Sequence, residues 1–380
     1  MSAEVAIVGV AQTKHGWGLQ DTVRGMNYNV TKEILEKTGL SVDDIETIVS
    51  STSDMWQGMG CSNVYHYDAA AGYLKDSTKA EEDSCLGFMY AYMRVLSGHF
   101  DIAMAISATK CSEVPPVATL TNLYCDPFYQ RPIALDDVSS AAIQARLYME
   151  RYGITEEQAA KVSVKSLGNA LRNPNAHRKM KITVKDVLKS EKIAYPLKEL
   201  DVCPASDGAC AVLLASKKVA KKITDTPVWI KGVGWNADSY FLGDRDLLDV
   251  IALKNAARDA YKMGGIKDPL KDVDVAEICA PTTFQELLWY ENLGFCRKGE
   301  GGKFMDSGIT EMDGKLPVNP SGGVMASNPY TARGLMSIAE ASMQVMGGAG
   351  KHQVKGAKTA IAHGTHGLAG QLHSVIVLGG

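Results

Sequence analysis

A cysteine at the start of a predicted helix, Cys85, is the first candidate nucleophile. It ends the polar segment EEDSC at 81–85 and precedes LGFMYAYMRVLSGH, whose apolar spacing predicts a helix. A thiol at a helix start faces unpaired backbone N–H groups and the positive end of the helix dipole, which lower its pKa and favour the thiolate. A small buried core residue is the alternative interpretation of the same position.

The second candidate site is the glycine-rich loop NPSGGVMASNPYTARG at 319–334, which carries Asn328 shortly before a predicted helix. The loop contains neither G-x-x-x-x-G-K-[ST] nor G-x-G-x-x-G after a strand, so it does not match a phosphate-binding motif. Its Gly322–Gly323 pair permits a close approach of the backbone. Asparagine cannot act as a base near neutral pH, but its amide can donate a hydrogen bond to a thioester oxyanion.

The third site is AHGTHGLAG at 362–370, a glycine-rich turn that is expected to join the last two strands and that holds His363 and His366. Two histidines three residues apart would need a further ligand to hold a metal, and the sequence offers no third ligand and no zinc-binding pattern. General acid/base catalysis is therefore the favoured interpretation. A pair of loop histidines without a catalytic role is the alternative.

The elements that must position these residues follow an order that occurs twice. The first copy comprises strands and helices at 5–10, about 22–37, 43–52, 86–99 and 101–110. The second comprises those at 228–235, about 247–262, 274–283, about 332–346, 358–363 and 373–380. The repetition predicts a duplicated α/β fold whose halves pack around a pseudo-twofold axis, with chance similarity between α/β units as the alternative.

A long segment without a repeat partner separates the strand ending near Lys110 from the strand at 208–216. Because it carries its own helices, it predicts an inserted domain at about 111–207 within an N-terminal half, 1–225, followed by a C-terminal half, 226–380. In such a pseudo-symmetric arrangement, the helix start at Cys85 faces the loop that precedes the helix at 332. The histidine-bearing turn then lies beside both.

Composition excludes several classes of function. The formal net charge of −3 gives no global attraction to nucleic acid or to an anionic membrane. No apolar run approaches the roughly 20 residues of a membrane-spanning helix. The eight cysteines include no C-x-x-C pair, and the N-terminus lacks a cleavage site, so reduced thiols and a cytoplasmic location are expected.

The order of motifs resembles that of thiolases of the sterol-carrier-protein and archaeal type. The shared motifs are AIVGVAQT, the cysteine after an acidic stretch, SDGACAVLLAS, ENLGFCRKGEGGKF, LPVNPSGG and the glycine-rich turn before the final strand. The resemblance implies a five-layered αβαβα thiolase fold with two duplicated halves and an inserted loop domain that holds coenzyme A. It also implies that Cys85 is the nucleophile that takes the acyl group.

The same resemblance indicates residues that border coenzyme A. His177, Arg178 and Lys179 lie in the region where family members contact the nucleotide phosphates. Three glycines, Gly322, Gly323 and Gly367, are expected to line the same substrate. Coenzyme A is a substrate in this family, so no permanently bound cofactor and no metal are expected.

The sequence departs from the thiolase pattern at three places. Thiolases usually carry Gly-His-Pro where this chain has Ser327–Asn328–Pro329, and their Asn-Glu-Ala-Phe or His-Asp-Cys-Phe motif falls on 279–282. Their Cys-x-Gly is replaced by HGTHG, with Gly364 nearest the position of the cysteine. Chain-initiating ketoacyl synthases and chalcone synthases combine cysteine, histidine and asparagine, but Cys279 holds the position of that histidine here. A comparable set in this chain would take its histidine from His366 or, as second choice, His363.

The resemblance predicts a thiolase that cleaves a 3-oxoacyl-CoA with coenzyme A through a cysteine acyl-enzyme. The altered acid/base set favours a branched or aromatic substrate such as benzoylsuccinyl-CoA, and the chain resembles the large subunits of benzoylsuccinyl-CoA thiolases. A condensing acyl-CoA synthase of the same fold and a non-catalytic scaffold subunit are the alternatives. A homodimer or dimer of dimers and a small zinc-ribbon/OB-fold protein are the expected partners.

Overall fold

The computed structural model describes residues 4–81 and 83–380. Within these residues, nine strands form one sheet and two short strands form another. The large sheet contains β1 Val5–Gln12, β2 Thr47–Thr52, β3 Asp76–Glu81, β4 Ile102–Lys110, β7 Asp207–Ser216, β8 Val228–Ala237, β9 Val275–Ile278, β10 Thr359–His366 and β11 Leu372–Gly379. The small sheet contains β5 Lys192–Ala194 and β6 Leu197–Lys198.

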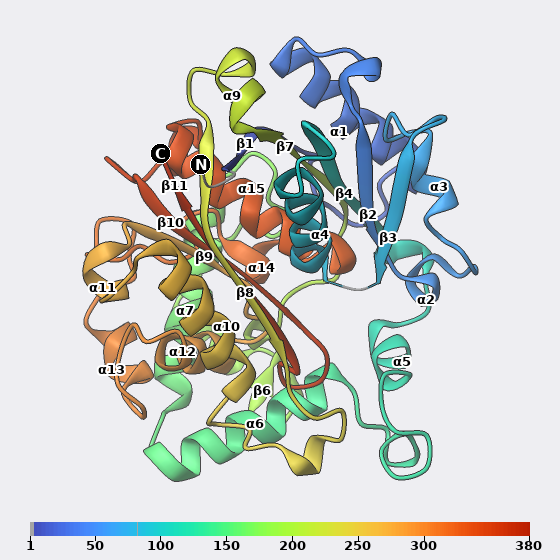
Figure 1. Cartoon of the computed structure of the whole chain (residues 1–380). Helices are drawn as coiled ribbons and strands as arrows, with labels where there is room; N and C mark the ends of the chain where they lie inside the picture. The colour runs from blue at the N-terminus through green and yellow to red at the C-terminus, as the bar shows by residue number, and fades with distance from the viewer. Residues whose placement is uncertain (1–3, 82) are drawn as a thin grey trace.

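Helices of very different lengths cover the sheet (Figure 1). They are α1 Val23–Thr38, α2 Asp54–Gln57, α3 Val64–Tyr67, α4 Ser84–Leu96, α5 Val117–Asn122, α6 Asp137–Tyr152, α7 Glu156–Ala170, α8 Val184–Lys189, α9 Lys217–Ile223, α10 Ile251–Gly264, α11 Pro269–Asp272, α12 Thr283–Asn292, α13 Gly301–Asp306, α14 Gly323–Ala326 and α15 Arg333–Met346. None of these described helices is long and apolar enough to cross a lipid bilayer.

The large sheet consists of two half-sheets that meet along a short line. Its strand order is β3-β2-β4-β7-β1-β8-β11-β10-β9, and β1 pairs with β8 only at Ala6↔Trp229 and Ile7↔Val228. Helices α4 and α15 lie between the two halves and contact strands of both, as Figure 1 shows at the centre of the molecule. Helices α1 and α9 cover the outer face of the first half, and α10 covers the outer face of the second.

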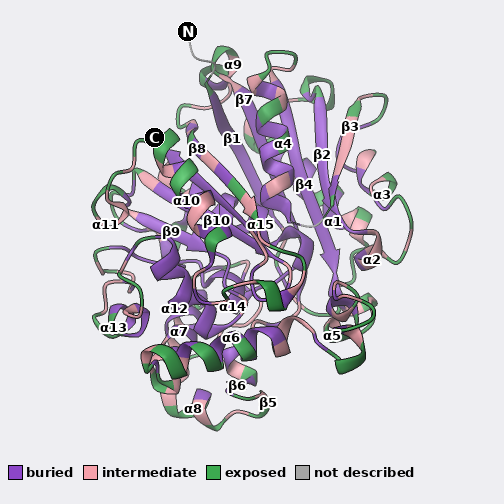
Figure 2. Cartoon of the chain, turned by 60° about the horizontal axis from the view of Figure 1, so that its bottom comes forward, coloured by how far each residue is buried: buried purple, intermediate pink, exposed green. Residues whose placement is uncertain are grey.

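This arrangement is the predicted five-layered αβαβα fold. Most strands of the large sheet are buried, whereas β3 at its edge and β8 carry half-buried and exposed residues (Figure 2). Many of the other exposed residues lie in the surrounding helices and loops. Separate apolar clusters fill the interfaces between layers, with the α4/α15 layer packing against Val212 of one half-sheet and Ala362 of the other. The duplicated order of elements therefore builds a layered core in which the two central helices start close to the same point.

Most predicted elements are confirmed with small changes of boundary, but the strand predicted at 274–283 is shorter: β9 ends at Ile278, and α12 begins at Thr283. Helix α1 begins after Thr22, whose side chain accepts a hydrogen bond from the Gly25 N–H, and ends at Gly39 with a φ of 70°. The histidine-bearing segment is the main difference. His363 and His366 lie within β10 and not in a turn, because β10 stays paired with β11 as far as His366↔Leu372.

The segment between β4 and β7 contains α5 to α8 and the small sheet. Its helix α7 packs against α12, α13 and α14 of the second half, and α6 packs against α12. We keep the domain boundaries predicted from the sequence, 1–225, about 111–207 and 226–380, as a proposal.

A buried ion pair fixes this segment to the glycine-rich loop. Lys165 Nζ on α7 lies 2.6 Å from Glu286 Oε1 on α12, and both side chains are 0% exposed. The other carboxylate oxygen of Glu286 accepts a hydrogen bond from Asn319 Nδ2 at 2.8 Å. Asn319 adopts a positive φ of 54° and accepts a hydrogen bond from the Ile278 N–H through its Oδ1. The start of the loop is therefore held at the end of β9.

We expect Lys165→Met to destabilise the protein by about 3 to 5 kcal/mol, because Glu286 would remain buried without its counter-charge. Chemical denaturation of the purified variant measures this change. The double variant Lys165→Met/Glu286→Gln should recover part of the loss, because no uncompensated charge remains. Lys32→Met, which breaks an exposed ion pair on α1 with Glu36, is the matched control and should cause little change. Equal effects at the two lysines would contradict this account of the buried pair.

Candidate active site

Cys85 lies in the first turn of α4 and is 0% exposed. Its backbone N–H donates a hydrogen bond to Oδ1 of the helix-capping residue Asp83 at 3.2 Å. Burial raises the pKa of the Cys85 thiol well above its usual value, and the nearby Asp83 and Cys279 raise it further, while Arg333 opposes them. The predicted lowering of this pKa by the helix start is therefore wrong for the resting protein, because burial disfavours the thiolate and the Asp83 carboxylate adds to that effect.

Two glycines bring the backbones of β10 and α15 close to Cys85. A methyl group at Gly364 of β10 would lie 2.6 Å from Cys85 Sγ and 2.4 Å from Asp83 Oδ2. A methyl group at Gly334 of α15 would lie 3.0 Å from the same sulfur and 2.7 Å from the Cys85 backbone nitrogen. The helix start at Cys85, the start of α15 and the histidine-bearing segment thus converge, as expected from the sequence.

The two candidate histidines lie on opposite faces of β10. Successive side chains of a strand alternate between faces, so His366 shares the face of Gly364, which is the face that meets Cys85. His366 and Asp83 also line one small pocket. His363 lies on the other face, where its Nε2 is hydrogen-bonded to His373 Nδ1 at 2.9 Å. The structure therefore places His363 away from the thiol.

His363 is further disfavoured as an acid/base group by its surroundings. Its ring stacks on that of His373 with the centroids 5.2 Å apart, and it is 0% exposed. Burial lowers the pKa of His363 well below its usual value, and His373 and Arg333 lower it further. These surroundings favour the neutral form of His363.

Cys279 lies directly after β9 and faces the same centre. Its backbone N–H donates to the His363 carbonyl at 3.2 Å, and its carbonyl accepts from Trp289 Nε1 at 3.1 Å. Burial raises the pKa of the Cys279 thiol to about 11, while Arg333 and a hydrogen bond from the Thr365 backbone lower it. Cys279 is thus a neutral thiol at neutral pH, like Cys85.

Asn328 is buried, but its amide is not directed at Cys85 in this structure. Asn328 Nδ2 donates to Cys203 Sγ at 3.2 Å, and the Asn328 backbone exchanges hydrogen bonds with Ser206. Cys203 was not singled out from the sequence; it lies in the run CPASDG, which precedes the strand at 208–216. Asn328 Oδ1 is buried and has no hydrogen-bond partner among the described residues.

Asn328 and Cys203 form one wall of a pocket of about 180 Å³. Its lining is mostly apolar and comes from α5, α6, the 202–205 segment, the residues after Cys279 and the loop before α15. The lining residues are Val117, Ala118, Thr121, Asp137, Val138, Val202, Cys203, Pro204, Ala205, Pro281, Thr282, Asn328 and Tyr330. Aliphatic walls with a few polar groups are typical of sites that bind small organic ligands.

Arg333 is a central residue that the sequence analysis missed. It is the first residue of α15, its side chain is 2% exposed, and its Nη2 donates to the Thr365 carbonyl at 2.8 Å. The only signal in the sequence was an arginine in TARG immediately after the Asn328 loop. The burial of this arginine depends on tertiary packing, so the local sequence does not predict it.

The residues predicted to border coenzyme A make structural contacts in this state. The His177 N–H donates to Ser327 Oγ, Arg178 Nη1 donates to the Val202 carbonyl, and Lys179 Nζ donates to the Pro174 carbonyl. His177 and Arg178 therefore fasten the segment at 173–179 to the Asn328 loop. Lys179 lies nearer the surface, on the rim of another pocket.

The predicted glycines differ in what surrounds them. Gly322 has a φ of 95°, and a methyl group there would lie 2.9 Å from Ala170 Cβ on α7. A methyl group at Gly323 would lie 2.8 Å from Asn319 Cγ. Both glycines therefore pack closely against protein atoms and do not form an open surface for a ligand. Gly367 follows β10 in the turn to β11, with a φ of 76°.

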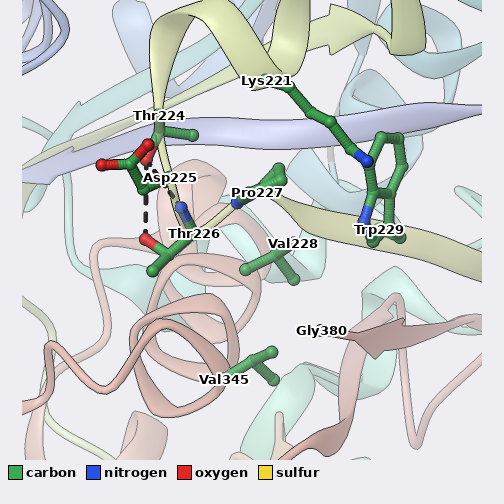
Figure 3. Close-up of a pocket in the computed structure, with 9 residues that line it drawn as sticks. All are labelled: Lys221, Thr224, Asp225, Thr226, Pro227, Val228, Trp229, Val345 and Gly380. Atoms are coloured by element: carbon green, nitrogen blue, oxygen red, sulfur yellow. Dashed lines mark hydrogen bonds between the residues drawn. The ribbon is translucent and has the colours of Figure 1, made fainter.

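A separate hollow of about 560 Å³ lies where α9, β8 and the C-terminus meet (Figure 3). It is bordered by the run 224–229 together with Lys221, Val345 and Gly380. It contains none of the cysteines or histidines described above. Among residues 4–81 and 83–380, no group of three or more His, Cys, Asp or Glu side chains is arranged to hold a metal ion.

Comparisons with known proteins agree with this geometry. Residues 235–380 match the family described as "Thiolase C-terminal domain-like". An acetyl-CoA acetyltransferase of Methanothermobacter thermautotrophicus is 35% identical, with 97% of each chain covered. The benzoylsuccinyl-CoA thiolase subunit BbsB of Thauera aromatica is 33% identical over 60% of this chain and 59% of its own.

Two solved structures share the fold. The Ltp2-ChsH2(DUF35) aldolase superposes with a TM-score of 0.85 at 24% identity, covering 99% of this chain and 97% of that one. Human mitochondrial 3-ketoacyl-CoA thiolase superposes with a TM-score of 0.72 at 14% identity, covering 99% and 98%. Both similarities extend over the whole chain and include the half that precedes residue 235.

Proposed function

This chain belongs to the thiolase superfamily and is an acyltransferase, and from that premise we propose that it cleaves a 3-oxoacyl-CoA with coenzyme A through an acyl-enzyme on Cys85. The observation that carries the proposal is the convergence on the Cys85 sulfur of Gly334 from α15 and Gly364 from β10. Neither glycine leaves room for a side chain, so the thiol is held at the meeting point of the two halves.

The first half of the reaction transfers the acyl group to the protein. His366 accepts the proton of the Cys85 thiol, and the thiolate attacks the 3-carbonyl carbon of the substrate. The bond between carbons 2 and 3 then breaks, leaving an acyl group on Cys85 and the enolate of a shorter acyl-CoA. His366 returns the proton to carbon 2 of that enolate, and the shorter acyl-CoA departs.

The second half regenerates the thiol. Coenzyme A gives its thiol proton to His366, and its thiolate attacks the carbonyl carbon of the acyl-enzyme. The sulfur of Cys85 leaves and takes the proton back from His366. Both halves pass through an oxyanion, for which we propose the Cys85 N–H, the backbone around 364–367 and the Asn328 amide as donors. In the resting protein the Cys85 N–H donates to Asp83 and the Asn328 amide donates to Cys203.

The pocket beside Asn328 supports a branched or aromatic acyl group. Its walls include Val117, Val138, Pro204 and Tyr330. Another lining residue, Pro281, lies two positions after Cys279 in the sequence. A compact apolar space of this kind favours a bulky acyl group over a polar one. Benzoylsuccinyl-CoA is one candidate, in keeping with the partial similarity to BbsB.

We further propose that the chain works in an assembly. The aldolase neighbour is a complex with ChsH2(DUF35), and BbsB is named as a subunit. A small zinc-ribbon/OB-fold partner and a homodimer or dimer of dimers formed through the first half are therefore the proposed partners, with coenzyme A and acyl-CoA as substrates and no permanently bound cofactor.

Product analysis tests the proposed reaction. The protein is incubated with coenzyme A and a panel of straight-chain, branched and aryl 3-oxoacyl-CoAs. The acyl-CoA products are separated by chromatography and identified by mass spectrometry. We expect two shorter acyl-CoAs, with one coenzyme A consumed for each substrate. Carbon–carbon bond formation from two acyl-CoAs without any cleavage would favour the condensing synthase, and inertness in both directions would favour the scaffold.

The two histidines provide a matched test of the acid/base assignment. We expect His366→Asn to lower kcat by about 10² to 10⁴, because the proposed proton carrier is lost. His363→Asn removes a buried imidazole three residues away and should leave kcat within about threefold, although the loss of its hydrogen bond to His373 should lower the melting temperature. Steady-state kinetics and thermal denaturation of both variants measure these effects. The opposite order of kcat losses would contradict the assignment.

A further inference from the structure

Arg333 is a buried cation without a contacting anion among the described residues, although the Asp83 and Asp137 carboxylates lie near enough to raise the pKa of its guanidinium. Its side chain is 2% exposed, and none of the ion pairs among the described residues includes it. Nη2 donates to the Thr365 carbonyl at 2.8 Å, whereas Nη1 is buried without a hydrogen-bond partner among the described residues. A buried charge without a partner is costly, so the fold must retain this guanidinium for a reason other than stability.

Aromatic stacking helps to hold the guanidinium in place. Its Cζ lies 4.6 Å from the centroid of the Tyr330 ring, and the other face of Tyr330 stacks on Trp56 at 4.1 Å. The Tyr330 hydroxyl donates to Asp137 Oδ2, which fixes the ring. Stacking of this kind orients an arginine without neutralising it.

The position of Arg333 connects it to both thiols of the centre. The next residue, Gly334, is the one whose added methyl group would lie 3.0 Å from Cys85 Sγ. Thr365, which accepts the hydrogen bond from Arg333, also hydrogen-bonds the Cys279 thiol through its backbone. The positive charge of Arg333 accordingly lowers the pKa of the thiols of Cys85, Cys279 and Cys203, against the larger opposing effect of burial.

We propose that Arg333 is the charge-stabilising residue of acyl transfer, whose guanidinium balances the thiolate of Cys85 and the oxyanions that form next to it. This inference rests on the proposed function. It adds a positive charge that stabilises the thiolate and the oxyanions in a buried centre. Thiolases usually carry a histidine in the loop before this helix, where the chain has Asn328. Arginine stays protonated and cannot transfer a proton, so Arg333 would stabilise the negative charge and His366 would transfer the proton.

The absence of a contacting counter-anion among the described residues makes the arrangement effective. The Asp83 and Asp137 carboxylates act on the guanidinium without forming an ion pair with it, so a direct anionic contact arises when a thiol is deprotonated or a carbonyl oxygen becomes negative. An interaction that is stronger in the transition state than in the resting state lowers the barrier, and a fixed cation needs no reorganisation to provide it. A permanent ion pair with a carboxylate would remove this advantage.

The test follows the thiolate directly, without substrate. Wild-type protein, Arg333→Gln, Arg333→Lys and Arg245→Gln are alkylated with iodoacetamide between pH 6 and 10, and modification of Cys85 is quantified by peptide mass spectrometry. Alkylation reports the thiolate fraction of this cysteine. Arg245 is the matched control, because it also donates to a backbone carbonyl of the C-terminal region, that of Leu368, but lies outside the thiol centre.

We expect Arg333→Gln to raise the pH of half-maximal Cys85 alkylation by at least about 1, which makes alkylation about tenfold slower at any pH below that midpoint. The direction follows because loss of a nearby positive charge disfavours the thiolate. Arg333→Lys, which keeps the charge, should stay within about 0.5 of wild type, and Arg245→Gln should match wild type.

An unchanged profile in Arg333→Gln would overturn the proposal, as would a wild-type Cys85 that is not alkylated at any pH. If Arg333→Gln does not fold, Arg333→Lys decides the question. A rise of more than 1 in its pH of half-maximal Cys85 alkylation overturns the proposal, and an unchanged value supports it. The proposed function is tested separately, because wild-type cleavage of 3-oxoacyl-CoA does not depend on these variants. Cleavage with an unshifted Arg333→Gln profile refutes the role of Arg333 alone.

Discussion

Gly364→Ala is expected to lower kcat/KM by at least about 100-fold while leaving the protein folded. The added methyl group would lie 2.6 Å from Cys85 Sγ, 2.9 Å from Cys85 Cβ and 2.4 Å from Asp83 Oδ2, all closer than van der Waals contact allows. The thiol must therefore move from its position between β10 and α15. A displacement of about 1 Å in a reacting group costs about two orders of magnitude in rate.

Gly168→Ala is the matched control for this change. Gly168 lies in α7, and a methyl group added there would meet no atom within 4 Å. Because alanine favours helix more than glycine does, this variant should be as stable as wild type or more so, with unchanged kinetics. Wild-type kcat/KM in Gly364→Ala would show that the close approach of β10 to Cys85 is not needed for catalysis.

Cys85→Ala is expected to lower kcat by at least about 10⁴-fold, because covalent acyl transfer has no alternative nucleophile in the correct place. Binding of acyl-CoA should remain, since the pocket beside Asn328 does not include Cys85. Steady-state turnover and equilibrium binding of a 3-oxoacyl-CoA measure the two quantities on the same preparation. The expected pattern is lost turnover with retained binding.

Cys210→Ala provides the comparison for loss of a buried cysteine. Cys210 is also 0% exposed, but it lies in the middle of β7, paired with Ser107 of β4. Its replacement should lower the melting temperature by a few degrees and leave turnover close to wild type. Turnover that survives Cys85→Ala as well as Cys210→Ala would rule out Cys85 as the nucleophile.

The layered fold could be predicted because its signals are local and repeated. The apolar spacing and Gly39 located α1, and the duplicated order of strands and helices led to the two halves. The convergence of Cys85 with the loop before α15 also followed from that repeat. In physical terms, each helix or strand is set by residues close together in the chain, so a short window of sequence contains the information, and the repeated order of these elements then indicates how the halves pack.

The detailed chemistry of the site depends on contacts between distant segments. The choice between His363 and His366 turns on which face of β10 each occupies, and the sequence HGTHG resembles a turn although it continues the strand. The Asn328–Cys203 contact spans 125 residues, and Arg333 lies over the ring of Tyr330, which in turn stacks on the distant Trp56. Similarly, the raised pKa of the Cys85 thiol depends on burial, which a helix start alone does not reveal.

The most direct test of the central claim is the mass of the intact protein after exposure to acyl-CoA. The wild-type chain is mixed with a panel of acetyl-, branched and aryl acyl-CoAs, quenched in acid and weighed, and the modified peptide is identified. Our account predicts one acyl group per chain, located on Cys85, absent from Cys85→Ala and removed by added coenzyme A. An unmodified wild-type chain across the whole panel, or an acyl group on another residue, would contradict it.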